Sequence, residues 1–168
     1  QSSSLRHFEL AINLYTQIGN PMEAARTRAL MGQLYERQAK IEKARYFFQT
    51  ALAEFSKLAD RVNQSAALYA LGQLELESNN LDLAENYLRQ SIEVTENIRR
   101  VSTSGDLMAA FSATVHDRYE SYIECLMRRS LTQTSKNLVV RAFETSELAR
   151  ARSLAELLRT TQTVLVPD

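Results

Sequence analysis

The stretch Met31-Gly32-Gln33-Leu34-Tyr35 returns one period later as Leu71-Gly72-Gln73-Leu74-Glu75, and this repetition decides the fold. The segments downstream keep the same offset at three further pairs of positions: Ala44 and Ala84, Phe48 and Leu88, Ala51 and Ser91. The offset between Gly32 and Gly72 is about 40 residues, and internal repeats with a period of 20 to 50 residues commonly stack helical hairpins, because each hairpin buries the apolar face that its neighbour leaves open. The pattern therefore predicts an all-α solenoid.

The glycines of the two stretches indicate how the helices pack. A small residue within a helix lets a second helix approach closely, because no side chain separates the two backbones. We therefore expect Gly32 and Gly72 to lie at close helix contacts, with Ala44 and Ala84 opposite them. A large side chain at either glycine would then overpack the core.

The composition is that of a helical chain with balanced charge. The 168 residues include 20 basic and 20 acidic residues, and only four glycines and two prolines, few enough for long helices. A nucleic-acid-binding protein normally carries a basic excess, so we expect no nucleic-acid partner. No apolar stretch approaches the roughly 20 residues that span a bilayer, so we expect no membrane partner. The single Cys125 excludes an intrachain disulfide and fits the cytoplasmic location that we predict.

Apolar spacing and capping signals predict about seven helices. Asn20-Pro21-Met22-Glu23 combines a capping residue, a proline at the first helical position and a glutamate that can complete a capping box. Asp60 is a similar cap, and a serine-rich break at 102–104 precedes the sixth helix. Only Val164-Leu165-Val166 has strand-like character. The expected helices cover about 4–18, 21–38, 41–58, 61–78, 81–100, 105–129 and 136–160.

The repeated pattern resembles the tetratricopeptide repeat over about residues 5–100. Met31-Gly32-x-x-Tyr35, followed by Ala44, Phe48 and Ala51, carries the resemblance. Its period, the step from Gly32 to Gly72, is longer than the family's usual period and is similar to that of the longer-helix variety in scaffold and regulatory proteins. The resemblance implies a right-handed superhelix of about three stacked hairpins that binds proteins or peptides and is not an enzyme.

The second copy departs from the family pattern. Glu75 stands where an aromatic residue is usual, and Ser91 replaces the second alanine. Arg28 occupies a position that is usually large and apolar, whereas Leu68 fills that position in the second copy. Residues 5–18 resemble the second helix of a preceding repeat.

We expect residues 1–168 to form a single domain of this kind. An alternative is a structural element that self-assembles into a homo-oligomer through two exposed apolar ends: Leu5, Phe8, Ile12, Tyr15 and Ile18 at one, Val164-Leu165-Val166 at the other. The expected parts are the second helix of a truncated repeat (1–19), two repeats (20–59 and 60–101), a longer divergent hairpin (104–160) and a linker to a missing domain (161–168).

The last third has a more specific resemblance. Residues 115–160, with the run Glu147-x-Ala149-Arg150-Ala151-Arg152-Ser153-Leu154, are similar to the helical segment that leads into CHAT domains, which are caspase-like. This implies the regulatory or scaffolding arm of a larger protein, and a downstream domain as a partner in cis. The peptidase His and Cys of that family would follow this segment, so no catalytic residue is carried over. Arg150 and Arg152 either pair with Glu147 and Glu156 along the helix or dock the downstream domain.

The histidine, cysteine and glutamate residues that could act in catalysis or metal binding are not spaced to form such a site. His116 and Cys125 are separated by about 13.5 Å and about 900° of rotation on one helix, so they point to opposite faces and cannot form a dyad. His116, Glu120 and Glu124 share a helix face, but with one imidazole the group is better interpreted as a solvated face than as a metal site. Cys125 is better interpreted as a small core residue. We expect no catalytic residue, cofactor or metal.

One polar stripe on each of two helices is a candidate binding surface. By the resemblance, these stripes face the inner, concave side of the superhelix, although an ordinary solvated face is the alternative interpretation. Their mixture of charges indicates a mixed-charge peptide as the ligand. Tyr69 is the residue expected to contribute most to binding. The candidate residues are Arg26, Gln33 and Arg37 on 21–38, and Tyr69, Gln73 and Glu77 on 61–78.

Overall fold

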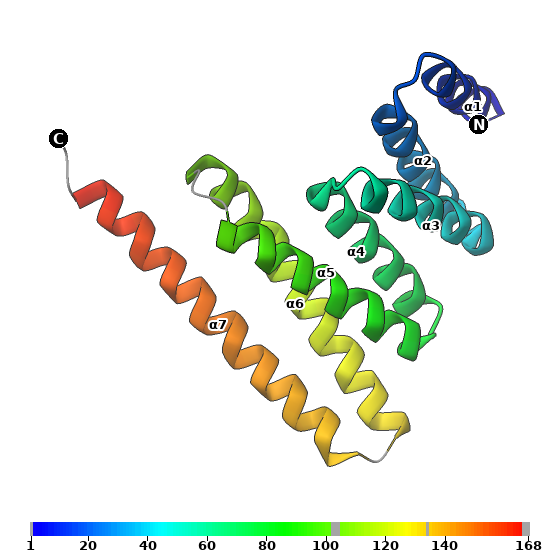
Figure 1. Ribbon diagram of the computed structural model, residues 1–168. Helices are drawn as coiled ribbons and strands as arrows, with labels where there is room; N and C mark the ends of the chain where they lie inside the picture. Colours follow the sequence, from blue (N-terminus) through cyan, green and yellow to red (C-terminus); the bar gives the residue numbers. More distant parts are fainter. Residues whose placement is uncertain (1, 102–104, 134, 166–168) are drawn as a thin grey trace. The chain divides into compact units, whose positions relative to one another are not determined.

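The chain is all-α, as predicted (Figure 1). The computed structural model describes residues 2–101, 105–133 and 135–165, without the side chains of residues 2, 3, 105–114, 156, 157 and 159–165. The predicted helices are confirmed, and their bounds differ by a few residues at most. The helices of the described part are α1 (Ser2–Gln17), α2 (Pro21–Glu36), α3 (Ile41–Lys57), α4 (Arg61–Glu77), α5 (Leu81–Val101), α6 (Gly105–Thr132) and α7 (Lys136–Leu165).

The C-terminal end of α7 corrects one expectation. Val164 and Leu165 belong to the helix, so the strand-like interpretation of this segment is wrong. Three residues of high strand propensity are too few to overcome continuation of a helix that is already formed, because propensity is a weak preference. Val166 lies outside the described residues.

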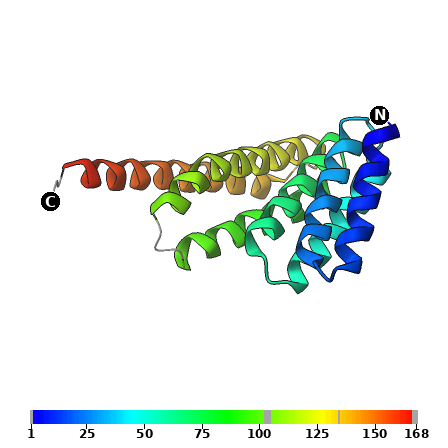
Figure 2. The same ribbon diagram turned by 90° about the horizontal axis from the view of Figure 1, so that it is seen from above.

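The chain divides into two compact units, Gln1–Val101 and Ser102–Asp168. The first contains α1–α5, and each of its helices packs against the next, as Figure 2 shows from above. This succession of antiparallel neighbours is an α-solenoid. The second unit contains α6 and α7, which run side by side as a hairpin.

All four turns of the first unit have the same conformation. Each has one residue in the left-handed region, with φ of 68° at Gly19, 55° at Ala39, 55° at Ala59 and 59° at Asn79. The next amide then donates to the carbonyl five residues earlier, as in Lys40 N to Tyr35 O at 2.9 Å. This bond satisfies a carbonyl that the end of a helix leaves open. The chain therefore reverses direction in the same way after α1, α2, α3 and α4.

The glycines do lie at close helix contacts, but the opposing residue differs from the expected one. A Cβ placed on Gly32 would lie 2.6 Å from Cδ1 of Phe48, and a Cβ on Gly72 would lie 2.7 Å from Cδ2 of Leu88. Ala44 and Ala84 are fully buried, yet the side chains that fill the space over the glycines come from one helical turn further along. The side chain nearest each glycine is thus Phe48 or Leu88 and not the expected alanine.

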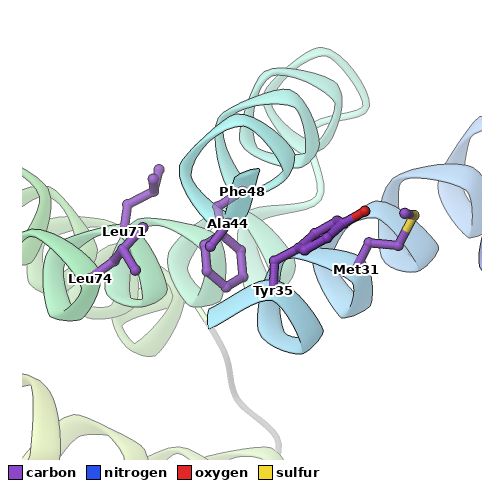
Figure 3. Packing of buried hydrophobic residues seen from close by; sticks show 6 residues of the cluster. All are labelled: Met31, Tyr35, Ala44, Phe48, Leu71 and Leu74. Atoms are coloured by element: carbon purple, nitrogen blue, oxygen red, sulfur yellow. The ribbon is translucent and has the colours of Figure 1, made fainter. Parts of the chain in front are cut away.

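The aromatic and aliphatic side chains around Gly32 form the core of the first repeat. Figure 3 shows Tyr35 and Phe48 in this cluster, with Leu71 and Leu74 contributed by α4. Tyr35 also stacks on Phe47, with ring centroids 5.4 Å apart. Because α4 shares the cluster with α2 and α3, the two repeats are joined by apolar burial.

The second repeat has hydroxyl groups where the first has apolar side chains. Ser65, Ser91 and Thr95 are almost completely buried between α4 and α5. Ser65 Oγ lies 2.6 Å from Thr95 Oγ1, and Ser91 Oγ donates to the carbonyl of Ser65 at 3.0 Å. At the equivalent positions, one period earlier, the first repeat has Ala25, Ala51 and Phe55. The hydroxyls are hydrogen-bonded, so their burial carries no desolvation penalty for unpaired groups.

Glu75, which replaces the usual aromatic residue, forms an ion pair between the repeats. Its side chain is 0% exposed, and Arg45 on α3 donates to it through Nε at 2.5 Å and through Nη2 at 3.0 Å. Asn80 donates a further hydrogen bond at 2.7 Å. The carboxylate is thus fully paired despite its burial, and a two-point contact of this kind fixes the position of α4 on α3.

Candidate functional site

A groove of about 310 Å³ lies between α2, α3 and α4 in the first unit. Four alanines and two aromatic rings give its apolar surface, and three polar side chains stand at its edge. We name it the α2–α4 groove. Its residues are Arg26, Ala29, Leu30 and Gln33 from α2, Phe48 and Phe55 from α3, and Asn63, Ala66, Ala67 and Ala70 from α4.

The groove exists because α4 has small side chains where it faces α2. Ala66 and Ala70 are four residues apart and so lie on one face of α4, and neither fills the space between the helices. The bulky Leu30 on α2 remains 48% exposed beside them. An exposed large apolar side chain next to an apolar groove is a feature of binding surfaces.

Arg26 stands at the edge of the groove as an accessible positive charge. Its side chain is 50% exposed and donates from Nη1 to Oε1 of Glu23 at 2.7 Å, three residues earlier on the same helix. An exposed pair of this type contributes only about 0.2–1 kcal/mol, so Arg26 can exchange Glu23 for a carboxylate of a ligand at little cost.

Only two of the six predicted binding residues line this groove. Arg26 and Gln33 do so, whereas Tyr69 and Gln73 are half-buried and bonded to each other, with Gln73 Nε2 donating to Tyr69 Oη at 2.7 Å. Arg37, the last of the three predicted on α2, caps that helix and is exposed.

Glu77, the sixth predicted residue, lies with acidic and basic neighbours at the C-terminal ends of α2 and α4. It is the exposed last residue of α4. Burial, followed by the charge of Glu77, raises the pKa of Glu36 above its usual value, and Arg37 acts in the opposite direction. The predicted set therefore divides into three pairs: Arg26 and Gln33 in the groove, Tyr69 and Gln73 bonded to each other on α4, and Arg37 and Glu77 at the helix ends.

The second unit places its candidate residues as ordinary helix-surface pairs. His116 Nε2 and Glu120 Oε1 lie 2.9 Å apart, both side chains being more than half exposed, and Glu124 pairs with Arg128 at 3.5 Å. No cluster of three potential metal ligands occurs among the residues that the structure describes. Cys125 is fully buried in the hairpin. These contacts match a solvated helix face and a core cysteine.

The two arginines proposed for domain docking have different surroundings. Arg150 is 78% exposed on its side chain and donates to Glu147 at 3.0 Å, and it borders a cleft of about 410 Å³ between α6 and α7. Arg152 lies over the ring of Tyr119 within the same hairpin, with its guanidinium carbon 5.7 Å from the ring centroid. The side chain of Glu156 lies outside the described residues.

No helix in the described ranges combines the length and the apolar character needed to cross a bilayer.

Comparison with known proteins supports a tetratricopeptide-like helical repeat. Residues 23–97 match the tetratricopeptide-repeat family model, which covers α2–α5. The crystal structure of BtubC (BKLC) from P. vanneervenii is similar, with a TM-score of 0.63 and 15% sequence identity over 96% of this chain and 57% of that chain. At this identity the likeness shows the fold alone, and this chain spans little more than half the length of that one. No curated protein matches the sequence.

Tetratricopeptide repeats generally mediate protein–protein interactions, and these matches indicate no enzyme family. The fold class is thus an all-α solenoid with two tetratricopeptide-like repeats in the matched region.

Proposed function

We propose that the chain is a protein-interaction module whose first unit binds a peptide segment of a partner in the α2–α4 groove. The observation that carries the proposal is the alanine-lined groove beside the exposed Leu30, with a polar edge. An apolar lining with a few placed polar groups is the usual composition of a binding site.

The lining defines the chemistry of the peptide. An apolar side chain of the ligand would occupy the space over Ala66 and Ala70, in contact with Leu30. An acidic side chain would pair with Arg26, and the amide of Gln33 would bond to the backbone of an extended peptide. Tyr69, Gln73, Arg37 and Glu77 remain a proposed second contact region, reached only by a longer segment.

Filling the groove is expected to weaken peptide binding. Peptides are first selected on the native chain from a random displayed library, and they should contain both an apolar and an acidic residue. Ala66→Leu should lower the affinity for these peptides by about tenfold or more, because the leucine takes the space of the ligand side chain. Binding is measured by isothermal titration calorimetry. Ala53→Leu, the same change on the exposed surface of α3, is the matched control and should bind as the parent does. Equal affinity of the selected peptides for the Ala66→Leu variant would place their site elsewhere.

We also propose that α6 and α7 support a downstream CHAT-like domain. The similarity of residues 115–160 to the segment that precedes such domains supports this, together with the exposed charge of Arg150. In a longer polypeptide that includes a CHAT-like domain after Asp168, Arg150→Glu should speed limited proteolysis between the two parts. Lys136→Glu, at the other end of α7, should leave the proteolysis rate unchanged. Equal rates in both variants and the parent would contradict docking through Arg150.

A further inference from the structure

The α2–α4 groove lies between two helices that run in the same direction. The same left-handed turn reverses the chain after α2 and again after α3, so α4 runs parallel to α2. The open amides of a helix give its N-terminal end positive character, and the open carbonyls give its C-terminal end negative character. Because both N-termini lie at one end of the groove, that end favours an anion and the opposite end favours a cation.

Arg26 is the accessible charge at the N-terminal end of the groove. It stands near the start of α2, and its 50% exposed side chain can exchange Glu23 for a carboxylate of a ligand. Asp60, the cap of α4, accepts two hydrogen bonds from the groove residue Asn63, at 3.1 and 2.6 Å. The charge of Asp60 is thus already bound within the chain, and Arg26 determines which charge this end receives.

Two carboxylates stand beyond the opposite end of the groove. Glu36 follows the lining residue Gln33 by three positions on α2, and Glu77 follows the lining residue Ala70 by seven positions on α4. Residues three, four or seven positions apart share one face of a helix. The two glutamates therefore continue the groove-lining faces of α2 and α4 toward the C-terminal ends of both helices.

These two carboxylates make that end of the groove negative. Burial, followed by the charge of Glu77, raises the pKa of the half-buried Glu36, and Arg37 offsets only part of this effect. Neither carboxylate has a hydrogen bond or an ion pair to another residue in the part of the chain that the structure describes. A cation at this position would relieve the repulsion between Glu36 and Glu77 and would also be favoured by the C-terminal ends of both helices.

The two charged ends are separated by the length of a short peptide. Arg26 and Glu36 lie about 15 Å apart along the axis of α2, at the rise of an α-helix. An extended peptide advances about 3.3 Å per residue, so about four or five residues cover this distance. The apolar side chain over Ala66 and Ala70 would lie between the two charges.

We propose that the peptide in the α2–α4 groove carries an acidic residue for Arg26 and, about four or five positions away, a lysine or arginine that binds between Glu36 and Glu77. The inference rests on the proposed function of the groove and adds the second charge and its spacing. Charge complementarity at both ends is its basis, since a peptide with charges of one sign would leave one end of the groove unmatched.

The peptides selected on the native chain from the random displayed library provide the probe. They should contain a basic residue about four or five positions from the acidic one. For one such peptide, isothermal titration calorimetry compares the selected sequence with a form in which glutamine replaces the basic residue. The native chain should bind the glutamine form about threefold or more weakly, because the pairing with the two carboxylates is lost.

Removing the two carboxylates tests whether the effect comes from this end of the groove. A double variant, Glu36→Gln with Glu77→Gln, should bind both forms of the peptide equally, because no carboxylate remains to pair with the basic residue. Glu9→Gln with Glu93→Gln removes the same total charge from exposed positions on α1 and α5 and should keep the native difference. Circular dichroism checks that all of these variants are folded.

Three results would overturn the inference. The first is the lack of a basic residue at this spacing in the selected peptides. The second is equal affinity of the native chain for the two forms of the peptide. The third is an unchanged difference in the Glu36→Gln, Glu77→Gln variant. Ala66→Leu should weaken both forms alike, so retained binding in that variant contradicts the groove itself, whereas the three results contradict only the assignment of the second charge.

Discussion

Replacing Arg45 with alanine is expected to destabilise the first unit by about 3–5 kcal/mol, because it leaves a carboxylate buried without its ionic partner. Glu75 is 0% exposed and would retain only the hydrogen bond from Asn80. The loss should be smaller for Glu75→Ala. Arg45 is 19% exposed and still pairs with Glu42, so water and that partner would compensate its charge. Urea unfolding followed by circular dichroism measures both free energies.

Two further variants test whether the loss comes from an unpaired buried charge. Arg45→Met combined with Glu75→Leu should unfold within about 1–2 kcal/mol of the parent, because removing both partners leaves no buried charge. Arg89→Ala breaks the exposed pair with Glu93, whose side chains are 46% and 56% exposed, and should change stability by less than about 1 kcal/mol. Similar losses for Arg45→Ala and Arg89→Ala would contradict the role assigned to burial.

The same ion pair determines the direction of the acid response. Burial alone would raise the pKa of Glu75, but the hydrogen bonds from Arg45 and Asn80 outweigh it and hold the pKa below its usual value. The stabilisation is therefore present above the unfolded pKa of about 4.3 and is lost as the pH falls through the folded value. Glu36 acts in the opposite direction, since its raised pKa means that protonation favours the folded state. Urea unfolding from about pH 7 to about pH 3 should show that the free energy of unfolding falls less in the Arg45→Met, Glu75→Leu double variant than in the parent.

Leucine at Gly32 or Gly72 is expected to destabilise the first unit by about 1–3 kcal/mol. A Cβ alone would lie 2.6 Å from the Phe48 ring at the first position and 2.7 Å from Leu88 at the second, and the Leu88 backbone nitrogen is 3.2 Å from it. The better helix propensity of leucine offsets at most about 1 kcal/mol of this strain. Thermal melting followed by circular dichroism measures the change.

A double-mutant cycle separates the collision from other effects of the new side chain. In a Phe48→Ala background the ring is absent, so Gly32→Leu should lose much less stability than in the parent. If Gly32→Leu and Gly72→Leu both melt as the parent does, the tetratricopeptide-like packing of α2–α5 is wrong.

The repeat period made the helices and their order predictable, because it combines apolar spacing with capping residues such as Asn20 and Asp60. The period also indicated close contacts at the glycines. It did not identify Phe48 as the residue opposite Gly32, since Ala44 and Phe48 lie on one face and differ by a single helical turn. Which turn lies over the glycine depends on the relative shift of two helices, and no local pattern encodes that shift.

The ion pair and the groove could not be predicted from local sequence patterns for a related reason. Arg45 and Glu75 are 30 residues apart, and as single residues they look like an ordinary surface charge and a departure from the family pattern. The groove exists because Ala66 and Ala70 are too small to fill the space between the helices, whereas the predicted binding surface was based on polar side chains. The run of alanines on 61–78 is the signal that would have indicated it.

The uniform left-handed turns make the first unit modular. Because the chain enters α3 after Ala39 and enters α5 after Asn79 with nearly the same backbone angle, residues 41–80 begin and end at interchangeable junctions. A duplicate of that segment inserted after Asn80 would meet the same geometry at both of its ends. Such a duplicate would also contain its own ion pair between Arg45 and Glu75. The backbone junctions can therefore accept a further repeat unit, whereas the helix contacts must adapt: α4 would face Ala51 and Phe55 of the duplicate, and Ser65 would lose its hydrogen bonds to Ser91 and Thr95.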